Sequence, residues 1–539
     1  MSSSKPFQNQ QDEEDSGPEM IDQDEVDEIL EEGDNDGDVA MDSDDDEAPE
    51  ELLLHNDSIA YFDQHKDSVF AIAQHPVYPH LIATGGSEGD ADDAPGKGYV
   101  IDTSSAASRP VLPPSYNSDP SAATQQPTEL QPIFEIDGHT DSINALAFTL
   151  PKGDFLVSGG MDGRLRAYAV AISDSSAQFK FVGESQETEE VNWVLACPSP
   201  AHPNTIALGA SDGSVWVFTI DASDSSNPIQ IVQSYFLHTG PCTAGAWTPD
   251  GLLLATVSED SSLHVFDVFG EAAAKSLVTE NGQTVVSLQG EADQRFFVEG
   301  GLYSVAIAPT GAFCAVGGAG GAIRVIGLPR LSSPPQAQQS KGASRPVPVQ
   351  RGPAGRRAAP SHNSSSSAAS QDPSAGAGAI LAALNVQSDS IETLTFAPAP
   401  QTLLVAGSVD GSIAVFDTAR SFAVRKHIKN AHEGESIVKV DFVRSATGPT
   451  AGWLLTSCGL DGILRRWDLR GATVSQQAAA AAAAAGGPGG AAPPTGLVKE
   501  WKGHRGGGEG GGILGFVQDP TGERVYTAGD DSVVLVFEA

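Results

Sequence analysis

The stretch Leu-Asp-Gly-Ile-Leu-Arg-Arg-Trp-Asp, from Leu460 to Asp468, organises this chain, because degenerate copies of it recur along most of the length. In each clear copy an aromatic residue stands six positions after the turn aspartate. The pairs are Asp162 with Tyr168, Asp212 with Phe218, Asp260 with Phe266, Asp410 with Phe416, Asp461 with Trp467 and Asp531 with Phe537. An aspartate in a tight turn accepts hydrogen bonds from nearby backbone N–H groups, and a following glycine tolerates positive φ. Each copy therefore predicts a turn between two strands.

Two degraded copies complete the series, one at Gly320 to Gly327 and one around Glu88 with Tyr99 to Asp102, so the chain has eight repeats. Upstream of the anchors lie runs of small and branched apolar residues, which predict innermost strands buried on both faces. Such runs are Ile143 to Phe148, Val191 to Cys197, Leu302 to Ala308, Ile391 to Ala397 and Ile437 to Phe442. Repeats of this kind are typical of four-stranded WD blades. We therefore predict an all-β, eight-bladed WD40 β-propeller.

The two ends of the repeat region predict how the ring closes. Val533 to Ala539 has the pattern of a third strand, with no fourth strand after it. Ser58 to Gln64 alternates in polarity and precedes the first repeat, where a fourth strand of the last blade would lie. Pairing of this segment with the last blade would remove an open sheet edge.

Composition divides the chain into residues 1–54, predicted to be a disordered acidic tail, and residues 55–539, predicted to be the propeller. Low-complexity insertions interrupt the blades at about 103–127, 331–378 and 471–496, and they are interpreted as mobile loops. No apolar run is long enough to span a bilayer, and no apolar signal segment begins the chain. The four cysteines have no paired spacing, which predicts buried, reduced thiols in a reducing compartment.

Charge is unevenly distributed. Between Asp12 and Glu51 there are 22 acidic residues, while Lys5 is the only basic residue of the first 51, and the rest of the chain keeps 49 acidic against 29 basic residues. Such an acidic chain disfavours sequence-specific nucleic acid and favours a basic peptide or protein as the partner. The second insertion contains Lys341, Arg345 and Arg351. It is interpreted as a solvated linker, with contact to RNA or to the acidic surface as the alternatives.

Acidic residues recur beside the repeat anchors. In a propeller, the turns between second and third strands and the starts of the innermost strands surround one mouth of the central channel. We therefore predict an acidic binding face, with one aromatic contact at Trp193. The predicted partner-binding residues are Asp67, Asp141, Glu189, Glu190, Trp193, Glu259, Asp389, Glu392, Glu435 and Asp530. Each carboxylate could also be an ordinary surface charge, and Trp193 could be a packing residue.

Catalysis is not expected. His139, Ser158 and Asp162 resemble a hydrolase triad. His432, Ser457 and Asp461 repeat the arrangement in another blade, with threonine at the serine position in further copies. Because a nucleophile is not repeated blade after blade, the set is interpreted as a structural hydrogen-bond network. The sequence shows no metal cluster and no phosphate-binding loop, so we predict no catalytic residues, no cofactor and no metal.

Four stretches carry a family resemblance: the acidic leader, His65 to Gly86, Asp389 to Asp417, and Leu454 to Asp468. Together they resemble the fungal WD-repeat ribosome assembly proteins of the Sqt type, whose animal relative is the angio-associated migratory cell protein. The resemblance implies a chaperone dedicated to one large-subunit ribosomal protein of the universal L-sixteen type. It also implies that the client's basic N-terminal segment binds the acidic face and is delivered to the pre-ribosomal large subunit.

The expected protein is a monomer in the cytoplasm, with the nucleus as a further compartment, and it binds no membrane. The long insertions depart from the family pattern and put contacts made through those loops in doubt. Two alternatives remain open at this point. One is a general WD40 scaffold or adaptor in signalling or ubiquitin ligation, and the other is an acidic histone-binding propeller.

Overall fold

A computed structural model describes residues 56–89, 91, 94–106, 127–173, 176–290, 293–331, 376–444, 448–470, 496–506 and 511–539. The predicted acidic tail and most of the three predicted insertions lie outside these residues. The chain divides at residue 54, and the described residues from 56 to 539 belong to one compact unit. No helix in the described ranges is long and apolar enough to cross a membrane.

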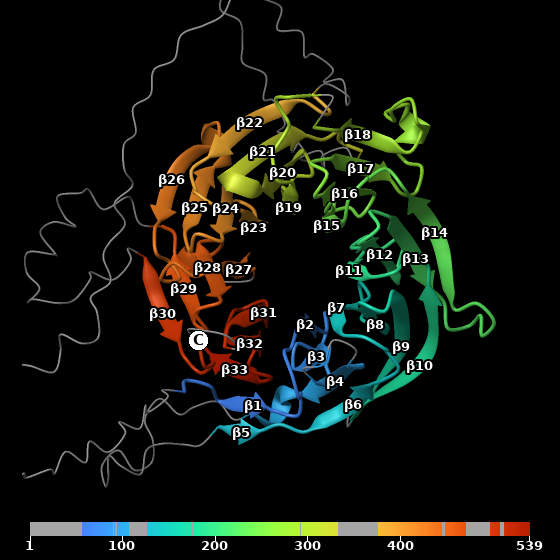
Figure 1. Cartoon of the computed structure of the whole chain (residues 1–539), viewed down its shortest axis with the longest axis vertical. Helices are drawn as coiled ribbons and strands as arrows, with labels where there is room; N and C mark the ends of the chain where they lie inside the picture. The colour runs from blue at the N-terminus through green and yellow to red at the C-terminus, as the bar shows by residue number, and fades with distance from the viewer. Residues whose placement is uncertain are drawn as a thin grey trace, which may run out of the picture. The chain divides into compact units, whose positions relative to one another are not determined.

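Eight antiparallel sheets surround a central axis, which confirms the prediction of an eight-bladed propeller (Figure 1). The innermost strands are β2 (Ala71–Gln74), β7 (Ile143–Phe148), β11 (Val191–Ala196), β15 (Cys242–Trp247), β19 (Leu302–Ile307), β23 (Ile391–Phe396), β27 (Ile437–Phe442) and β31 (Ile513–Gln518). The second strands are β3 (Leu81–Ser87), β8 (Phe155–Gly160), β12 (Thr205–Ala210), β16 (Leu253–Ser258), β20 (Phe313–Gly318), β24 (Leu403–Ser408), β28 (Leu454–Gly459) and β32 (Arg524–Gly529). The predicted innermost strands agree with the observed ones to within one residue.

The outer half of each blade completes the sheet. The third strands are β4 (Gly96–Asp102), β9 (Arg164–Ser173), β13 (Val215–Ile220), β17 (Leu263–Asp267), β21 (Ala322–Gly327), β25 (Ile413–Asp417), β29 (Leu464–Asp468) and β33 (Val534–Glu538). The outermost strands of blades 1 to 7 are β6 (Pro132–Ile136), β10 (Ser176–Gln186), β14 (Ile229–Tyr235), β18 (Thr284–Leu288), β22 (Ile380–Asn385), β26 (Ala423–Ile428) and β30 (Leu497–Trp501). Short 3-10 turns are η2 (Thr103–Ser105), η4 (Ala273–Lys275), η5 (Ala319–Gly321), η6 (Thr418–Arg420) and η7 (Gly448–Thr450).

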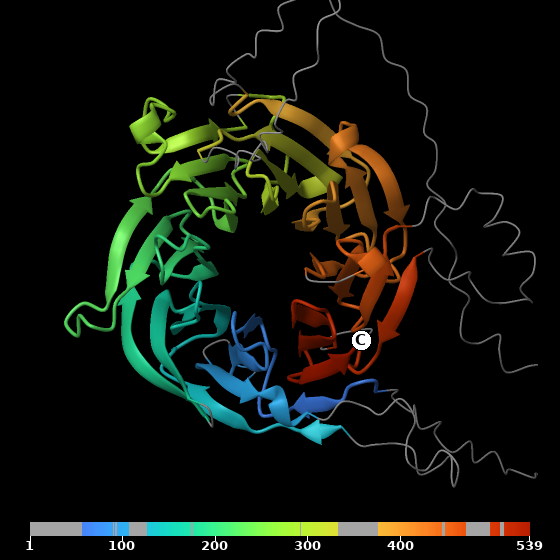
Figure 2. The ribbon, with the colours of Figure 1, turned by 180° about the vertical axis from the view of Figure 1, so that it is seen from behind.

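The N-terminal strand closes the ring, as predicted. Strand β1 (Ala60–Phe62) is antiparallel to β33 and supplies the fourth strand of blade 8, with Phe62 opposite Val534. Ile59 and Phe62 pack into an apolar cluster with Tyr99 of blade 1. This cluster joins the two ends of the propeller, and both views show the first and last strands side by side (Figure 1, Figure 2).

A second closing strand was not predicted. Strand β5 (Thr128–Glu129) lies parallel to β1 and continues directly into β6 of blade 1. The Leu130 N–H also donates to the Tyr61 carbonyl at 2.8 Å. One segment therefore spans the outer edges of blades 8 and 1. Backbone hydrogen bonds close the ring in two places, between β1 and β33 and between β1 and β5.

The core lies between the blades. Each blade presents apolar side chains to its neighbour, and one such cluster joins Val217 and Tyr235 of blade 3 to Leu254 and Phe266 of blade 4. The four cysteines are buried and form no disulfide, as predicted. Because both faces of every blade are covered by its neighbours, the faces left for a partner are the two ends of the ring and its rim.

Candidate functional site

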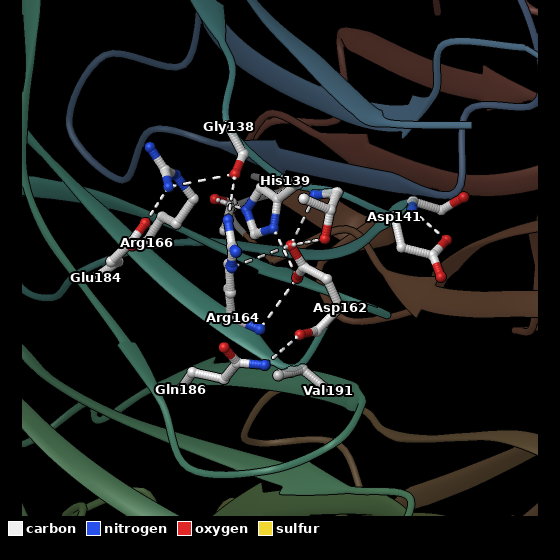
Figure 3. Close-up of polar contacts among 12 residues, drawn as sticks. Gly138, His139, Asp141, Asp162, Arg164, Arg166, Glu184, Gln186 and Val191 are labelled. Carbon is white, nitrogen blue, oxygen red and sulfur yellow. Dashed lines mark hydrogen bonds and ion pairs between the residues drawn. The ribbon is translucent and has the colours of Figure 1, made fainter. Parts of the chain in front are cut away.

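The turn aspartates form a buried hydrogen-bond network. In blade 2, His139 Nδ1 lies 3.0 Å from Asp162 Oδ1 (Figure 3). His139 Nε2 lies 2.8 Å from Ser158 Oγ. Asp162 also accepts the Arg164 N–H at 3.0 Å. Burial alone would raise the pKa of Asp162, but the hydrogen bond with His139 and those from the backbone hold it below its ordinary value. The network ties the loop before the innermost strand to the turn and to the second strand.

The same network recurs in blades 7 and 8. His432 contacts Asp461 and Ser457 at 2.9 and 2.7 Å, and His504 contacts Asp531 and Thr527 at 2.9 and 2.7 Å. Ser158 and Ser457 are fully buried, so no substrate reaches their hydroxyls. The geometry agrees with the structural interpretation of these residues. Blade 6 uses Gln387 in place of histidine, and its Nε2 donates to the Ser412 carbonyl at 2.7 Å.

Blade 1 keeps the histidine but lacks the aspartate. His65 Nε2 lies 2.9 Å from Thr84 Oγ1, while His65 Nδ1 has no partner among the described residues. The ring packs edge-on against Phe62 and Tyr99. Burial lowers the pKa of His65 to about 3. Burial also lowers the pKa of His264 to about 3. Both imidazoles are therefore neutral in the folded protein.

These two histidines predict a pH-dependent stability. The unfolded chain binds protons at histidine near pH 6.5 and the folded chain does not until about pH 3, so stability falls as the pH falls through that window. Each histidine is expected to remove about 2 kcal/mol of unfolding free energy between pH 6.5 and 5. The variant His65→Gln, which copies blade 6, is expected to lose its share of this slope. Urea unfolding at both pH values measures it, and an unchanged slope in His65→Gln would contradict the assignment.

One end of the ring collects the loops before the innermost strands and the turns between second and third strands. A backbone N–H of the turn donates to a carbonyl of the loop in seven blades, at 2.9 to 3.2 Å. The donor and acceptor residues are Met161 and Ser142, Ser211 and Glu190, Glu259 and Pro241, Ala319 and Gly301, Val409 and Ser390, Leu460 and Ser436, and Asp530 and Gly512. The turn of blade 2 also lies against the loop before the innermost strand of blade 3. This contact requires Gly163, which has φ +72° and whose added Cβ would lie 2.1 Å from the Thr188 carbonyl oxygen.

All ten predicted binding residues belong to this end. Six carboxylates lie in the loops before innermost strands: Asp67, Asp141, Glu189, Glu190, Asp389 and Glu435. Glu259 and Asp530 lie in turns between second and third strands. Trp193 and Glu392 lie at the starts of innermost strands. We name the end of the ring that carries these nine carboxylates the acidic mouth.

Three of the aspartates share one local geometry. Asp67, Asp141 and Asp389 are each followed by serine, and in each case the aspartate Oδ1 accepts the serine N–H at 2.6 to 2.8 Å. Figure 3 shows Asp141. The Ser68 hydroxyl in turn donates to Asp530, which brings Asp530 and Asp67 together across the closure. These aspartates therefore order their loops, and the bonds occupy Oδ1 of each.

No basic side chain of the described residues neutralises the nine carboxylates of the acidic mouth. Within the described ranges, none of them lies within 4.0 Å of a lysine, arginine or histidine nitrogen, whereas the anchor Asp461 pairs with Arg465. Solvent reaches Glu392, but the surrounding protein and the charge of Asp389 raise its pKa. Burial and the charges of Glu259 and Glu392 raise the pKa of Tyr303. A cation placed among these groups would relieve their repulsion.

Trp193 is held in a slot between blades 3 and 4. A Cβ added to Gly209 or Gly245 would lie 2.4 Å from indole atoms, so the ring packs between two glycines. Its Nε1 donates to the Cys242 carbonyl at 3.2 Å. The side chain stays half-buried with one part open to solvent. The slot gives Trp193 a packing role, and contact with a partner through the open part stays a prediction.

Sequence reasoning missed a bulge at the start of the innermost strands. In blade 2, Ile143 pairs with Gly160 and Ala145 pairs with Gly159, which leaves Asn144 as the extra residue. Seven innermost strands have this irregularity at the same place. The extra residues are Asn144, Asn192, Thr243, Tyr303, Glu392, Val438 and Leu514. A bulge changes the direction of the extra side chain. The extra residue is always the second residue of the apolar run, and this position could have located the bulge from the sequence.

The described residues that flank the three predicted insertions lie at the other end of the ring. Each insertion interrupts the connection from a third strand to an outermost strand: β4 to β6, β21 to β22 and β29 to β30. Third strands begin at the acidic mouth and run away from it, so the described residues that flank the insertions lie at the opposite end. Those flanking residues leave the acidic mouth uncovered.

Comparison with known proteins gives several similarities. The family described as WD domain, G-beta repeat matches residues 130–168 and 229–267. A crystal structure of Chaetomium thermophilum Sqt1 bound to the N-terminus of the ribosomal protein L10 is 61% identical, with a TM-score of 0.72. The similarity covers 90% of this chain and 100% of that one.

Two curated proteins are also similar over shorter stretches. The ribosome assembly protein SQT1 of Saccharomyces cerevisiae is 33% identical over 243 residues, which are 44% of this chain. The match spans about half of the yeast protein, 48% of its length. The angio-associated migratory cell protein of Homo sapiens is 22% identical over 340 residues, covering 63% of this chain and 60% of that protein.

Proposed function

Because the chain belongs to the Sqt1 family of WD-repeat ribosome assembly proteins, we propose that it is a chaperone for one ribosomal protein. The acidic mouth holds the basic N-terminal segment of a newly made large-subunit ribosomal protein. The client is the counterpart of L10 in the solved relative, and the sequence resemblance implies the universal L-sixteen type. The chaperone acts as a monomer in the cytoplasm and delivers its client to the pre-ribosomal large subunit.

The observation that carries this proposal is the set of unpaired carboxylates at one end of the ring. Nine carboxylates lie there without a basic partner among the described residues, and the charge of Asp389 helps to raise the pKa of Glu392. The propeller does not need these charges for packing, since Glu189, Glu190 and Glu259 are exposed. A segment rich in lysine and arginine is the chemistry that such a surface recognises.

Electrostatics also supports the order of events. A free ribosomal protein extension repels itself and binds RNA without selection, and a surface of opposite charge shields it. Each exposed ion pair contributes only about 0.2 to 1 kcal/mol, so affinity requires several pairs at once. The summed field chiefly raises the association rate. Release follows when rRNA phosphates compete for the same cations, with no hydrolysis step by this chain.

Direct binding of the full chain tests the proposal. The probes are a synthetic peptide of the N-terminal segment of the ribosomal protein and a histone-tail peptide of equal charge. We expect the ribosomal peptide to bind more tightly, and its affinity to fall as salt rises, because the contacts are exposed ion pairs. A preference for the histone tail would support a histone-binding propeller instead. Failure to bind either peptide would support a general scaffold.

Purification of the full chain from cells that express it gives an independent readout. One stoichiometric ribosomal protein, identified by mass spectrometry, is expected. A spread of signalling proteins or ubiquitin ligase subunits in its place would contradict the chaperone proposal.

A further inference from the structure

The bulged residues divide the acidic mouth into two sectors. Blade 1 follows the same register as the others, because Ala71 pairs with Gly85 as Ala145 pairs with Gly159. Phe70 therefore occupies the place of Asn144. Around the ring, the bulge position is polar in blades 2 to 6 and apolar in blades 7, 8 and 1. The polar set is Asn144, Asn192, Thr243, Tyr303 and Glu392, and the apolar set is Val438, Leu514 and Phe70.

At three positions of the polar sector, the side chain forms a hydrogen bond to the neighbouring blade. Asn144 Nδ2 donates to the Val191 carbonyl at 2.6 Å, and Asn192 Nδ2 donates to the Cys242 carbonyl at 3.0 Å. The Thr243 hydroxyl donates to the Leu302 carbonyl at 2.7 Å. These bonds join neighbouring innermost strands, so the polarity of blades 2 to 4 is explained by the scaffold. Tyr303 and Glu392 remain as polar groups at the mouth.

In the apolar sector, Val438 packs partly against the core cluster of blades 7 and 8, whereas Phe70 and Leu514 belong to no core cluster of the described residues. Phe70 is 42% exposed, and Val438 and Leu514 are partly exposed. Strands β27, β31 and β2, which carry or adjoin them, are neighbours around the axis (Figure 1). An innermost strand has blades on both faces and another strand on its outer edge, so its exposed atoms face the channel or its mouth. These three side chains therefore form one apolar strip at the mouth.

A fourth residue extends the strip. Leu460, in the turn of blade 7, is 38% exposed, and its side chain lies against Gly512 of blade 8, where an added Cβ would approach Leu460 Cδ2 to 2.7 Å. We name Leu460, Val438, Leu514 and Phe70 the apolar strip. Glu435 and Asp67 come three residues before Val438 and Phe70, and the Asp530 N–H donates to the Gly512 carbonyl at 2.9 Å. The nearby Lys439 is turned away, since its Nζ donates to the Phe516 carbonyl at 2.9 Å.

We propose that the apolar strip binds an aromatic or branched aliphatic side chain of the same segment whose basic residues bind the carboxylates. This inference rests on the proposed function and specifies its client: a basic segment with at least one large apolar residue. Exposed apolar atoms ringed by carboxylates mark a site for a partner that carries both chemistries. A purely basic peptide would leave the strip in water. The apolar anchor therefore gives selectivity among cationic chains, which charge alone does not provide.

Two synthetic peptides with the same number of arginines test this inference on the full chain. One contains tyrosine and leucine, and in the other serine replaces both. We expect wild type to prefer the apolar peptide by about thirtyfold, and Phe70→Ala with Leu514→Ala to remove most of that preference. The matched control is Ile231→Ala with Val498→Ala, two similarly exposed apolar residues on outermost strands, and it should keep the preference. If the double variant does not fold, the single variant Phe70→Ser is tested in its place.

Other outcomes overturn the inference in distinguishable ways. Equal binding of the two peptides to wild type would contradict the apolar anchor and mean that the acidic mouth recognises charge alone. If neither peptide bound, the proposed function would be contradicted as well. Self-association of the full chain that Phe70→Ser abolishes, measured by light scattering, would show that a second copy covers the strip.

Discussion

Replacing Glu190, Glu259 and Glu435 by lysine is expected to weaken binding of the basic ribosomal peptide by roughly a hundredfold. All three side chains are exposed and come from blades 3, 4 and 7. Each replacement removes an attraction of about 0.2 to 1 kcal/mol and adds a repulsion of similar size, so the three together cost about 3 kcal/mol. Isothermal titration at low salt measures the affinity. The loss should shrink at high salt, where exposed charges are screened.

The matched control reverses the same number of charges at the other end of the ring. Glu271, Glu280 and Glu523 are exposed and lie in connections opposite the acidic mouth. Their replacement by lysine changes the net charge equally, so a specific site predicts a much smaller loss. Equal losses in the two triple variants would mean that total charge, and not the acidic mouth, attracts the peptide. Unchanged melting temperatures in both variants exclude unfolding as the cause.

Asp461→Ala is expected to lower the unfolding free energy by about 3 kcal/mol. Asp461 is buried, and it accepts from Ile463 N–H at 3.1 Å, contacts His432 Nδ1 at 2.9 Å and pairs with the Arg465 guanidinium. Removing the carboxylate leaves a buried cation and a buried imidazole short of a partner. Urea unfolding, followed by the fluorescence of buried Trp467 in the same blade, reports the change.

Asp212→Ala is the comparison within the same chain. Asp212 holds the same turn position in blade 3. Among the described residues its side chain bonds only Ser214, at 2.9 Å to the N–H and 2.6 Å to the hydroxyl, and pairs with no histidine or arginine. Loss of neutral hydrogen bonds should cost about 1 kcal/mol. If the two variants were equally unstable, the charged network of blade 7 would not be the source of the effect. Both folded variants should still bind the basic peptide, since neither aspartate is one of the nine carboxylates of the acidic mouth.

Local patterns were sufficient for most of the fold. The turn at Asp461-Gly462 is made by residues adjacent in sequence, and so is the burial of an innermost strand such as Ile437–Phe442. The closing strand was also predictable, because Ser58 to Gln64 alternates in polarity and the last blade lacked a strand. Strand β5 was not, since two residues after a long insertion show no periodicity.

The candidate site was predictable in position but not in detail. Asp67, Asp141 and Asp389 lie one residue before a serine at equivalent places, which the repeat spacing locates. The slot around Trp193 was not predictable, because Gly209 and Gly245 come from a different strand and a different blade. The bulges were missed for a similar reason: an extra residue is defined only by the register of its partner strand.

Repeat spacing and short-range hydrogen bonding were thus enough to establish eight blades, their turns and the acidic character of one end, because these properties depend on neighbours in sequence. The slot for Trp193, the double closure and the apolar strip arise only when separate blades meet, and so does the lack of basic partners for the carboxylates among the described residues. Val438, Leu514 and Phe70 are far apart in the chain, and the repeat pattern does not distinguish them from other apolar residues. Ring closure places blades 7, 8 and 1 in succession, and that adjacency turns three scattered apolar residues into one surface.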